Sequence, residues 1–468
     1  MVLGWYTLPP RAIVLCLNAI WFKANKTQNS DNGFVRQSYL PWDTNGTLQV
    51  PSNVTRICRA LLPDSPDGTQ QIIYYQAGVG TESTLWNHVV GGGTGAGISE
   101  NIREAYAFLA TNYDAGDEIY LLGFSRGAFT ARSIAGFLDC IGLLTMAGME
   151  HFYSIFKDWE NQDKKHYKSH WPHRPFSNRP SAADPAYART LEGLGFTRVN
   201  ITIQAVGVWD TVGALGIPSI GIFPPHNQEY SFVNTKVSNN VEYAFQALAL
   251  DEHRKPFSPT IWERPEGPAK LKQLKQVWFP GVHSNVGGSY DDTSMADLTL
   301  AWMISHLSPF LAFRPDYISY VHQQNIDYYA AQKKPLRHWS LGKIYNSATG
   351  FETLAGSKVR TPGRYREMSS SGEDGGRLLE GTEEYVHASV RVRIGLGGLG
   401  TEDKGPYRPK ALDGWKCFGN GGQGGWRWVY DGVGKGKKLE LPEDELGEVE
   451  LGLLMESPPA ANYWRDRK

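Results

Sequence analysis

The pentapeptide Gly123-Phe-Ser125-Arg-Gly127 has the residue types and the spacing of a turn that presents a nucleophilic serine. An apolar, strand-like run, Ile119 to Phe124, leads into it, and a helix-forming run, Ala128 to Leu138, follows at once. In this context a G-x-S-x-G serine occupies a strained turn with its hydroxyl exposed above a sheet. The two glycines are needed because a side chain at either point would collide where strand and helix approach. The pattern predicts a nucleophilic Ser125; the alternative is an ordinary Gly-Ser turn.

A serine hydroxyl is a weak nucleophile at neutral pH, so this turn needs a general base and an acid that orients the base. In chains with such a turn the order is serine, acid, histidine. Asp210 ends the strand-like run Ile201 to Trp209, and His283 lies in a glycine-lined loop after the run Gln276 to Phe279. The carboxyl edge of a parallel sheet is where ligands bind. We therefore predict that Ser125, Asp210 and His283 form a catalytic triad.

Other interpretations of these residues remain open at the level of sequence. Asp210 has the alternative role of a helix N-cap or turn acid beside Thr211. His283 has that of a loop histidine hydrogen-bonded to backbone. Asp251 and His253 are rival partners for Ser125, but Arg254 follows them, and a structural salt-bridge cluster is the simpler interpretation there.

The elements that must position these residues alternate between two types. Apolar runs predict strands at 12–17, 71–75, 119–124, 201–209 and 276–279, and helical patterns predict helices at 101–114, 128–138, 241–250 and 297–308. Such alternation indicates an α/β fold with a mainly parallel sheet and helices on both faces.

Two regions depart from the alternation. Residues 146–196 are rich in aromatic residues, Lys, His and Pro, and we interpret them as an inserted lid over the site. Their aromatic side chains and lysines suit an acyl chain and an anionic lipid surface, although a plain structural cap has the same composition. After residue 345, glycine clusters and tryptophans predict an appended β-rich or irregular region ending in a short amphipathic helix. We expect a catalytic domain at 11–345 and a C-terminal region at 346–468.

Composition limits the partners and the compartment. The chain has 468 residues and a formal net charge of -1, so it lacks the basic excess that a nucleic-acid partner requires. Its four cysteines show no metal or redox spacing, which suits a reducing compartment, and we expect a cytoplasmic protein. The apolar run Ala12 to Phe22 is too short to span a bilayer. A signal peptide is the alternative there, but a buried strand is the better interpretation. We expect no cofactor and no metal.

Several motifs together resemble the uncharacterised α/β-hydrolase family that includes bacterial type VI secretion phospholipase effectors, and most of all its fungal members. The resemblance covers about residues 11–310. Its matching segments are Pro51–Thr55, Tyr74–Gly80, Gly95–Gly97, Gly116–Glu118, Gly123–Arg132, Gly207–Gly213, Ala249–Glu252 and Trp278–His283. It implies an α/β-hydrolase three-layer sandwich with esterase or phospholipase-type activity. It also implies that Ser125 is the nucleophile and His283 the base, with Asp210 as our choice of acid.

One segment departs from the family pattern. The family usually has Asp-Gly-Thr-Trp after its first core strand, where this chain has Asn18-Ala19-Ile20-Trp21. By topology this loop lends an oxyanion N–H beside the backbone N–H of Arg126. Ala19 replaces a glycine that a positive φ or close approach to the substrate requires.

Two functions therefore stand after the sequence is read. The first is a serine hydrolase of carboxylic esters in lipid metabolism, with a lipid or phospholipid as substrate and transient contact with a membrane surface. The second is a catalytically impaired scaffold that works as an interaction module. The intact serine, acid and histidine favour the first, and the altered Asn18-Ala19 loop favours the second.

Overall fold

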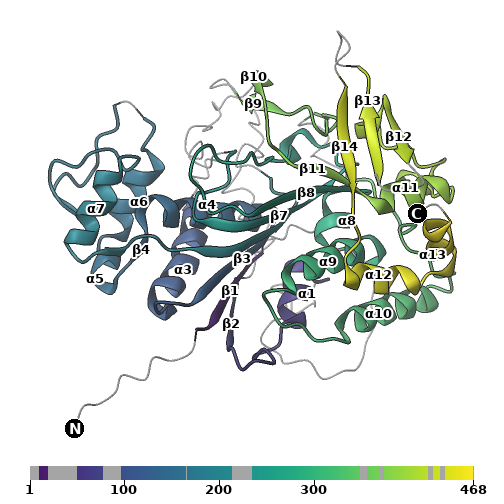
Figure 1. Ribbon diagram of the computed structural model, residues 1–468, viewed down its shortest axis with the longest axis horizontal. Coiled ribbons are helices and arrows are strands. Elements are labelled where there is room, and N and C mark those ends of the chain that lie inside the picture. The colour runs from purple at the N-terminus through teal and green to yellow at the C-terminus, as the bar shows by residue number, and fades with distance from the viewer. Residues whose placement is uncertain are drawn as a thin grey trace.

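A large, mainly parallel β-sheet forms the centre of the molecule (Figure 1). The computed structural model describes residues 10–18, 50–76, 96–164, 166–212, 235–347, 356–368, 374–419, 425–432 and 438–466. The strands of the central sheet are β1 (Ala12–Leu17), β2 (Gln71–Gln76), β3 (Glu118–Phe124), β6 (Ile203–Trp209), β7 (Val241–Ala249), β8 (Gln273–Phe279), β11 (Glu384–His387), β12 (Trp415–Gly419), β13 (Trp426–Tyr430) and β14 (Leu439–Asp444). Their spatial order is β12-β13-β14-β11-β8-β7-β6-β3-β1-β2. Neighbours from β2 through to β14 are parallel, and β13 and β12 continue antiparallel.

Helices cover both faces of this sheet, which confirms the predicted α/β-hydrolase-like fold (Figure 1). The described helices are α1 (Asn53–Ala60), α3 (Ala96–Asn112), α4 (Arg126–Ile141), α5 (Met146–Met149), α6 (Phe152–Glu160), α7 (Pro185–Gly193), α8 (His283–Gly287), α9 (Ser294–Leu307), α10 (Tyr317–Ala331), α11 (Ala388–Gly395), α12 (Glu448–Met455) and α13 (Pro458–Arg465). Two small antiparallel sheets of two strands each lie outside the central sheet: β4 (Leu143–Leu144) with β5 (Thr197–Arg198), and β9 (Arg366–Met368) with β10 (Asp374–Leu378). Among the described helices, none has both the length and the apolar character to cross a membrane.

Strand β1 shows how the sheet is buried on both sides. All its residues are buried, and alternate side chains join different clusters. Ile13, Leu15 and Leu17 pack with α3 and α4, whereas Val14 and Cys16 pack with α1 and α9. A parallel strand covered on both faces has a continuous apolar sequence. The prediction of a buried strand here is confirmed.

Residues 241–250 were expected to form a helix, and that prediction is wrong. They form strand β7, which runs parallel between β6 and β8 in the middle of the sheet. Its alanine, leucine, glutamate and glutamine residues have good helix propensity. In the centre of the sheet, however, Ala244 is buried on one face and Phe245 on the other. Packing on both faces overrides the local preference.

The segment 146–196 lies away from the predicted lid position. Its ends meet beside β4 and β5, where Thr145 N donates to Phe196 O at 2.9 Å. Helix α4 begins directly after Ser125 and has 16 residues, so those ends lie about 24 Å along the helix from the serine. The helices α5, α6 and α7 accordingly gather at one side of the molecule (Figure 1). The described part of this segment is an insertion against the far half of α4, not a lid over Ser125.

The aromatic residues of this insertion serve its own packing. Phe152, Phe156 and Trp159 are buried, and the Trp159 ring lies 5.1 Å from the ring of Phe137 on α4. Tyr153 remains 55% exposed. Most of the apolar surface that suggested an acyl-chain contact is therefore used to attach the insertion to the core.

The described C-terminal residues are β-rich, and they extend the central sheet. Strand β11 pairs with β8 in parallel, and β14 pairs with β11. Helix α12 packs against α9, and its residues Leu453 and Leu454 are buried in the same cluster as the α9 side chains. A short helix, α12, is present where one was predicted, but it does not close the region, because the helix α13 follows it. The division of the chain at residue 345 into two domains stays a prediction.

The close contact between α4 and β1 predicts that replacing Gly127 with alanine destabilises the protein. A Cβ on Gly127 would lie 2.0 Å from the Leu17 carbonyl oxygen, so Gly127→Ala must push the helix away from the strand. We expect the free energy of unfolding to fall by about 1–3 kcal/mol. Chemical denaturation measures this change.

The matched control for that variant is Gly136→Ala in the same helix. Its Cβ would meet Trp159 at an ordinary 3.5 Å, and alanine favours a helix interior over glycine by about 0.5–1 kcal/mol. We expect this control to be neutral or stabilising. Equal stability of the two variants would contradict the proposed contact.

Candidate active site

The backbone at Ser125 is strained in the way that a nucleophilic serine turn requires. Ser125 has φ 58° and ψ -117°, a region that residues with a side chain rarely occupy, and it links β3 directly to α4. Both glycines of the motif stand at points of close approach. A Cβ on Gly123 would lie 2.5 Å from the Gly127 carbonyl oxygen. The sequence prediction of a tight strand–turn–helix at this motif is confirmed.

Asp210 lies beside Ser125 because their strands are in register. Phe124 pairs with Trp209 across β3 and β6, so each of the two residues is the first after its strand. Ser125 N also donates to Trp209 O at 3.1 Å. Asp210 is fully buried, has φ 42°, and accepts a hydrogen bond from Ala249 N at 3.0 Å.

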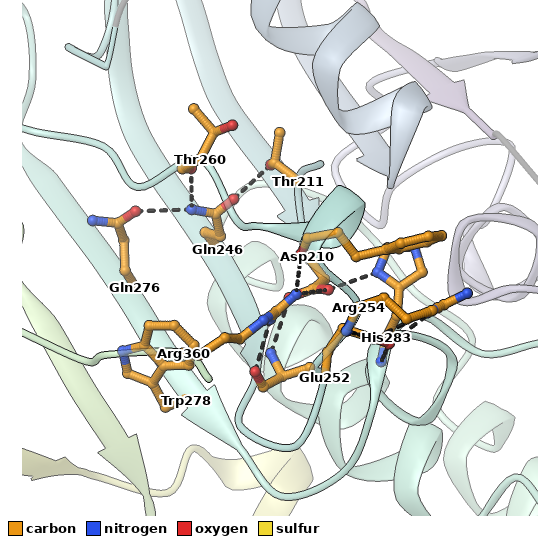
Figure 2. A network of polar contacts seen from close by, with 12 residues as sticks. Asp210, Thr211, Gln246, Glu252, Arg254, Thr260, Gln276, Trp278, His283 and Arg360 are labelled. Atoms are coloured by element: carbon orange, nitrogen blue, oxygen red, sulfur yellow. Dashed lines mark hydrogen bonds and ion pairs between the residues drawn. The ribbon is translucent and has the colours of Figure 1, made fainter. Parts of the chain in front are cut away.

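His283 is the first residue of α8 and meets the acid directly (Figure 2). Its Nδ1 lies 2.6 Å from Oδ2 of Asp210. Because an ionised carboxylate only accepts, the proton of this bond belongs to Nδ1, which leaves Nε2 as the basic nitrogen. The backbone N–H of His283 donates to Glu252 Oε2 at 3.3 Å.

Two aromatic rings place the imidazole next to the serine turn. The ring of Phe124, the residue before Ser125, lies 4.6 Å from the His283 ring, and the ring of Phe257 lies 5.0 Å from it. Within the described residues, no hydrogen bond joins Ser125 to His283. Such contacts are often long without substrate. The structure thus brings acid and histidine into contact and places the serine beside them.

The charge on Asp210 is stabilised by a residue that the sequence analysis did not select. Arg360 Nη1 and Nη2 lie 2.5 and 2.9 Å from the two Asp210 oxygens (Figure 2). Burial alone would raise the pKa of the Asp210 carboxyl, but Arg360 and His283 outweigh burial and hold that pKa well below its ordinary value. Asp210 is therefore ionised at neutral pH.

The rival residues have other partners. Asp251 accepts hydrogen bonds from Gly281 N at 2.6 Å and from the Tyr407 hydroxyl at 2.9 Å, and burial raises its pKa to about 6. Glu252 forms an ion pair with Arg254 at 3.0 Å. An ion pair is present in this segment, but Glu252 forms it rather than the predicted Asp251 or His253. Among the described contacts neither Asp251 nor His253 touches the imidazole.

Of the three residues predicted to form the oxyanion site, Arg126 and Asn18 lie among the described residues. Arg126 is the first residue of α4, so its N–H belongs to a helix N-terminus, which favours negative charge. Burial lowers the pKa of its guanidinium to about 10. Asn18 is buried, accepts from Ser52 Oγ at 3.0 Å and donates to Tyr75 Oη at 3.1 Å. Ala19 lies outside the described residues.

A groove elsewhere in the protein does not serve this site. It has a volume of about 1060 Å³ and is lined by Ala12, Gln71 and Glu118, at the amino ends of β1, β2 and β3. Ser125 follows the opposite end of β3, whose seven residues span about 20 Å. The groove and the serine therefore lie at opposite edges of the sheet.

Comparison with known proteins finds a related sequence and related structures. An uncharacterized protein of Saccharomyces cerevisiae, YEL023C, is 29% identical over 224 residues, which cover 44% of this chain and 29% of the yeast protein. The structure of the Tle1 effector bound to the VgrG spike from the type 6 secretion system aligns at 17% identity, with a TM-score of 0.26, over 61% of this chain and 52% of that one. An uncharacterized protein from Pseudomonas aeruginosa aligns at 14% identity, with a TM-score of 0.31, over 69% and 50%.

These relatives are longer than the region they share with this chain, which spans about half or less of each. The family match is broader. Residues 11–306 match the family described as type VI secretion system phospholipase effector Tle1-like, catalytic domain. They include the serine turn and the strand ends that carry Asp210 and His283. This chain belongs to the Tle1-like phospholipase effector family.

Proposed function

We propose that this protein is a serine hydrolase that cleaves carboxylic esters, with a lipid or phospholipid as its substrate. The observation that carries the proposal is the 2.6 Å contact between His283 Nδ1 and Asp210 Oδ2, made beside the strained turn at Ser125. Membership of a family described as phospholipase effectors supports this class of reaction.

The proposed mechanism assigns one role to each residue. Ser125 Oγ attacks the acyl carbon while His283 Nε2 accepts the hydroxyl proton, and Asp210 stabilises the imidazolium through Nδ1. The oxygen of the tetrahedral intermediate faces the N-terminus of α4, with the N–H of Arg126 as a donor. His283 then protonates the leaving alcohol. A water molecule that His283 activates next hydrolyses the acyl-serine, which releases the acid and restores Ser125.

A catalytically impaired scaffold that serves as an interaction module is the second candidate. The altered Asn18-Ala19-Ile20 sequence is the feature that favours it. The Asn18 side chain is held by Ser52 and Tyr75, and loss of one oxyanion donor typically costs about 10²–10³ in turnover. Because the acid–histidine contact is intact, we favour the hydrolase.

The thiols support a reducing compartment, and we propose the cytoplasm. All four cysteines are free, and Cys16 and Cys58 are buried in the same core cluster. Cysteines that remain thiols suit a reducing environment. A phospholipid substrate would bring the protein into transient contact with a membrane surface.

Ser125→Ala tests the nucleophile. Because covalent capture needs the serine oxygen, a fluorophosphonate probe should label wild type at Ser125 and should not label the alanine variant. Fatty acid release from phospholipid vesicles, measured in parallel, should be lost with the labelling. Mass spectrometry of the labelled peptide locates the adduct.

Ser133→Ala is the matched control for this variant. Ser133 lies on the same helix and donates to Phe129 O at 2.9 Å, so its loss should leave labelling unchanged. Equal labelling of wild type and Ser125→Ala would end the hydrolase proposal and favour the scaffold.

Asp210→Asn tests the acid through both activity and stability. We expect kcat to fall by about 10⁴ because the amide no longer fixes the imidazole tautomer. At neutral pH the free energy of unfolding should fall by about 3–5 kcal/mol, since the buried charge of Arg360 loses its partner. Esterase assays and urea unfolding measure the two effects.

The stability difference between wild type and Asp210→Asn should depend on pH. Since folding depresses the Asp210 pKa, its stabilisation is complete above the unfolded value of about 3.9 and is lost as pH falls through the folded value. The difference in the free energy of unfolding between wild type and Asp210→Asn should therefore become smaller at acidic pH. Asp297→Asn, which breaks the buried pair with Arg56, is the control and should keep activity. If the stability difference between wild type and Asp210→Asn did not change with pH, Asp210 would not be a buried carboxylate with a depressed pKa.

A further inference from the structure

Arg360 binds the acid of the acid–histidine pair although it lies far from Asp210 and His283 in the sequence. It lies in the segment 356–368, beyond the family match at residues 11–306. Its side chain is only 2% exposed. Besides both oxygens of Asp210, it donates to Ala249 O at 2.7 Å and to Phe257 O at 2.8 Å.

The guanidinium fixes the direction in which the carboxylate faces. Arg360 Nη1 and Ala249 N share Oδ1 of Asp210, while Arg360 Nη2 and His283 Nδ1 share Oδ2. A planar guanidinium that binds both oxygens leaves the carboxylate no freedom to turn away from the imidazole. Arginine also stays protonated when buried, so the compensating charge is permanent.

The segment that carries Arg360 is tied to the loops of the site. Lys255 N donates to Gly356 O at 3.0 Å, and Lys358 N donates to His253 O at 2.8 Å. Further along, the ring of Tyr365 stacks on Trp278 of β8, with centroids 6.1 Å apart. The position of Arg360 is therefore set by the residues that follow the family match together with the ends of β7 and β8.

The same segment is held by the C-terminal strands. Gly363 N donates to Glu384 Oε2 at 2.9 Å, and the same oxygen accepts the indole N–H of Trp278 at 2.8 Å. Glu384 is the first residue of β11, which pairs with β8. The C-terminal extension of the sheet thereby supports the segment that reaches Asp210.

We propose that Arg360 is a positioning residue for the reaction, so that the C-terminal region completes the active site by orienting and charging Asp210. The proposal rests on the hydrolase function proposed above. Arg360 acts through Asp210 and His283 and touches no reacting atom. A purely structural ion pair would affect stability and leave the pH dependence of the serine's reactivity unchanged.

The pH dependence follows from the surroundings of Asp210. Burial favours its neutral form, and Arg360 with His283 opposes burial. The other ionisable groups that interact electrostatically with Arg360 are Asp251, Glu252, His253 and Tyr365. Removal of Arg360 raises the pKa of the Asp210 carboxyl, so reactivity is lost at a higher pH than in wild type.

The experiment measures the rate of fluorophosphonate labelling of Ser125 across acidic and neutral pH, on the full chain. Arg360→Met should lower the rate at neutral pH by on the order of a hundredfold, because the acid is no longer aligned. In wild type the labelling rate falls as the pH is lowered, and we call this fall the acid limb of the pH profile. Arg360→Met should move the acid limb to higher pH by about one pH unit or more. Arg360→Lys keeps a charge but not the fork, so its rate should fall while its acid limb stays close to that of wild type.

Arg391→Met is the matched control. Arg391 is a buried arginine of the same region that binds both oxygens of Glu443, at 2.7 and 2.8 Å, and does not contact Asp210. It should lose stability and keep the rate and the acid limb of wild type. Circular dichroism establishes which variants fold. If Arg360→Met does not fold, the labelling rate of Arg360→Lys tests the inference.

The outcomes separate the inference from the function on which it rests. Absence of labelling in wild type would remove the hydrolase proposal and this inference together. Labelled wild type with an Arg360→Met acid limb in the wild-type position would overturn the inference alone. So would an Arg360→Lys protein that reacts as fast as wild type, or an Arg391→Met protein that shows the same shift as Arg360→Met.

Discussion

The site depends on the compensation of one buried charge. Four hydrogen bonds surround the carboxylate of Asp210, from Ala249 N, from His283 and from both Nη atoms of Arg360. An ionised carboxylate without such partners would be costly to bury and would take up a proton. To supply these donors, the fold brings together the ends of β6, β7 and β8 and the segment that carries Arg360, which is 150 residues further along the chain than Asp210.

A second constraint acts at the serine turn, and it is one of space rather than charge. The strained backbone of Ser125 is kept in place because β3, β1 and α4 approach so closely that Gly123 and Gly127 have no room for a side chain. The register between β3 and β6 then sets Asp210 beside the serine. Rigid strands therefore position the nucleophile and its acid, while the described loops after β7 and β8 supply the histidine and its supports.

The sequence predicted what local pattern determines. Apolar alternation led to the parallel sheet, and glycine spacing led to the turn at Ser125. It failed at 241–250, where helix formers are buried as a central strand, and at 146–196, whose aromatic residues pack on α4. Arg360 could not be found, since a single arginine in a segment without a motif gives no local signal. Only the fold shows that this arginine lies opposite a buried acid.

The most direct test of this account is a crystal structure of the protein after reaction with a fluorophosphonate. We expect a phosphorus–oxygen bond at Ser125 Oγ, with His283 Nε2 facing that oxygen and the phosphonyl oxygen directed at the N–H of Arg126. We also expect the Asp210 carboxylate to stay bound to His283 and Arg360. An adduct on another residue, or an imidazole turned away from Ser125 toward a different acid, would contradict the proposed mechanism.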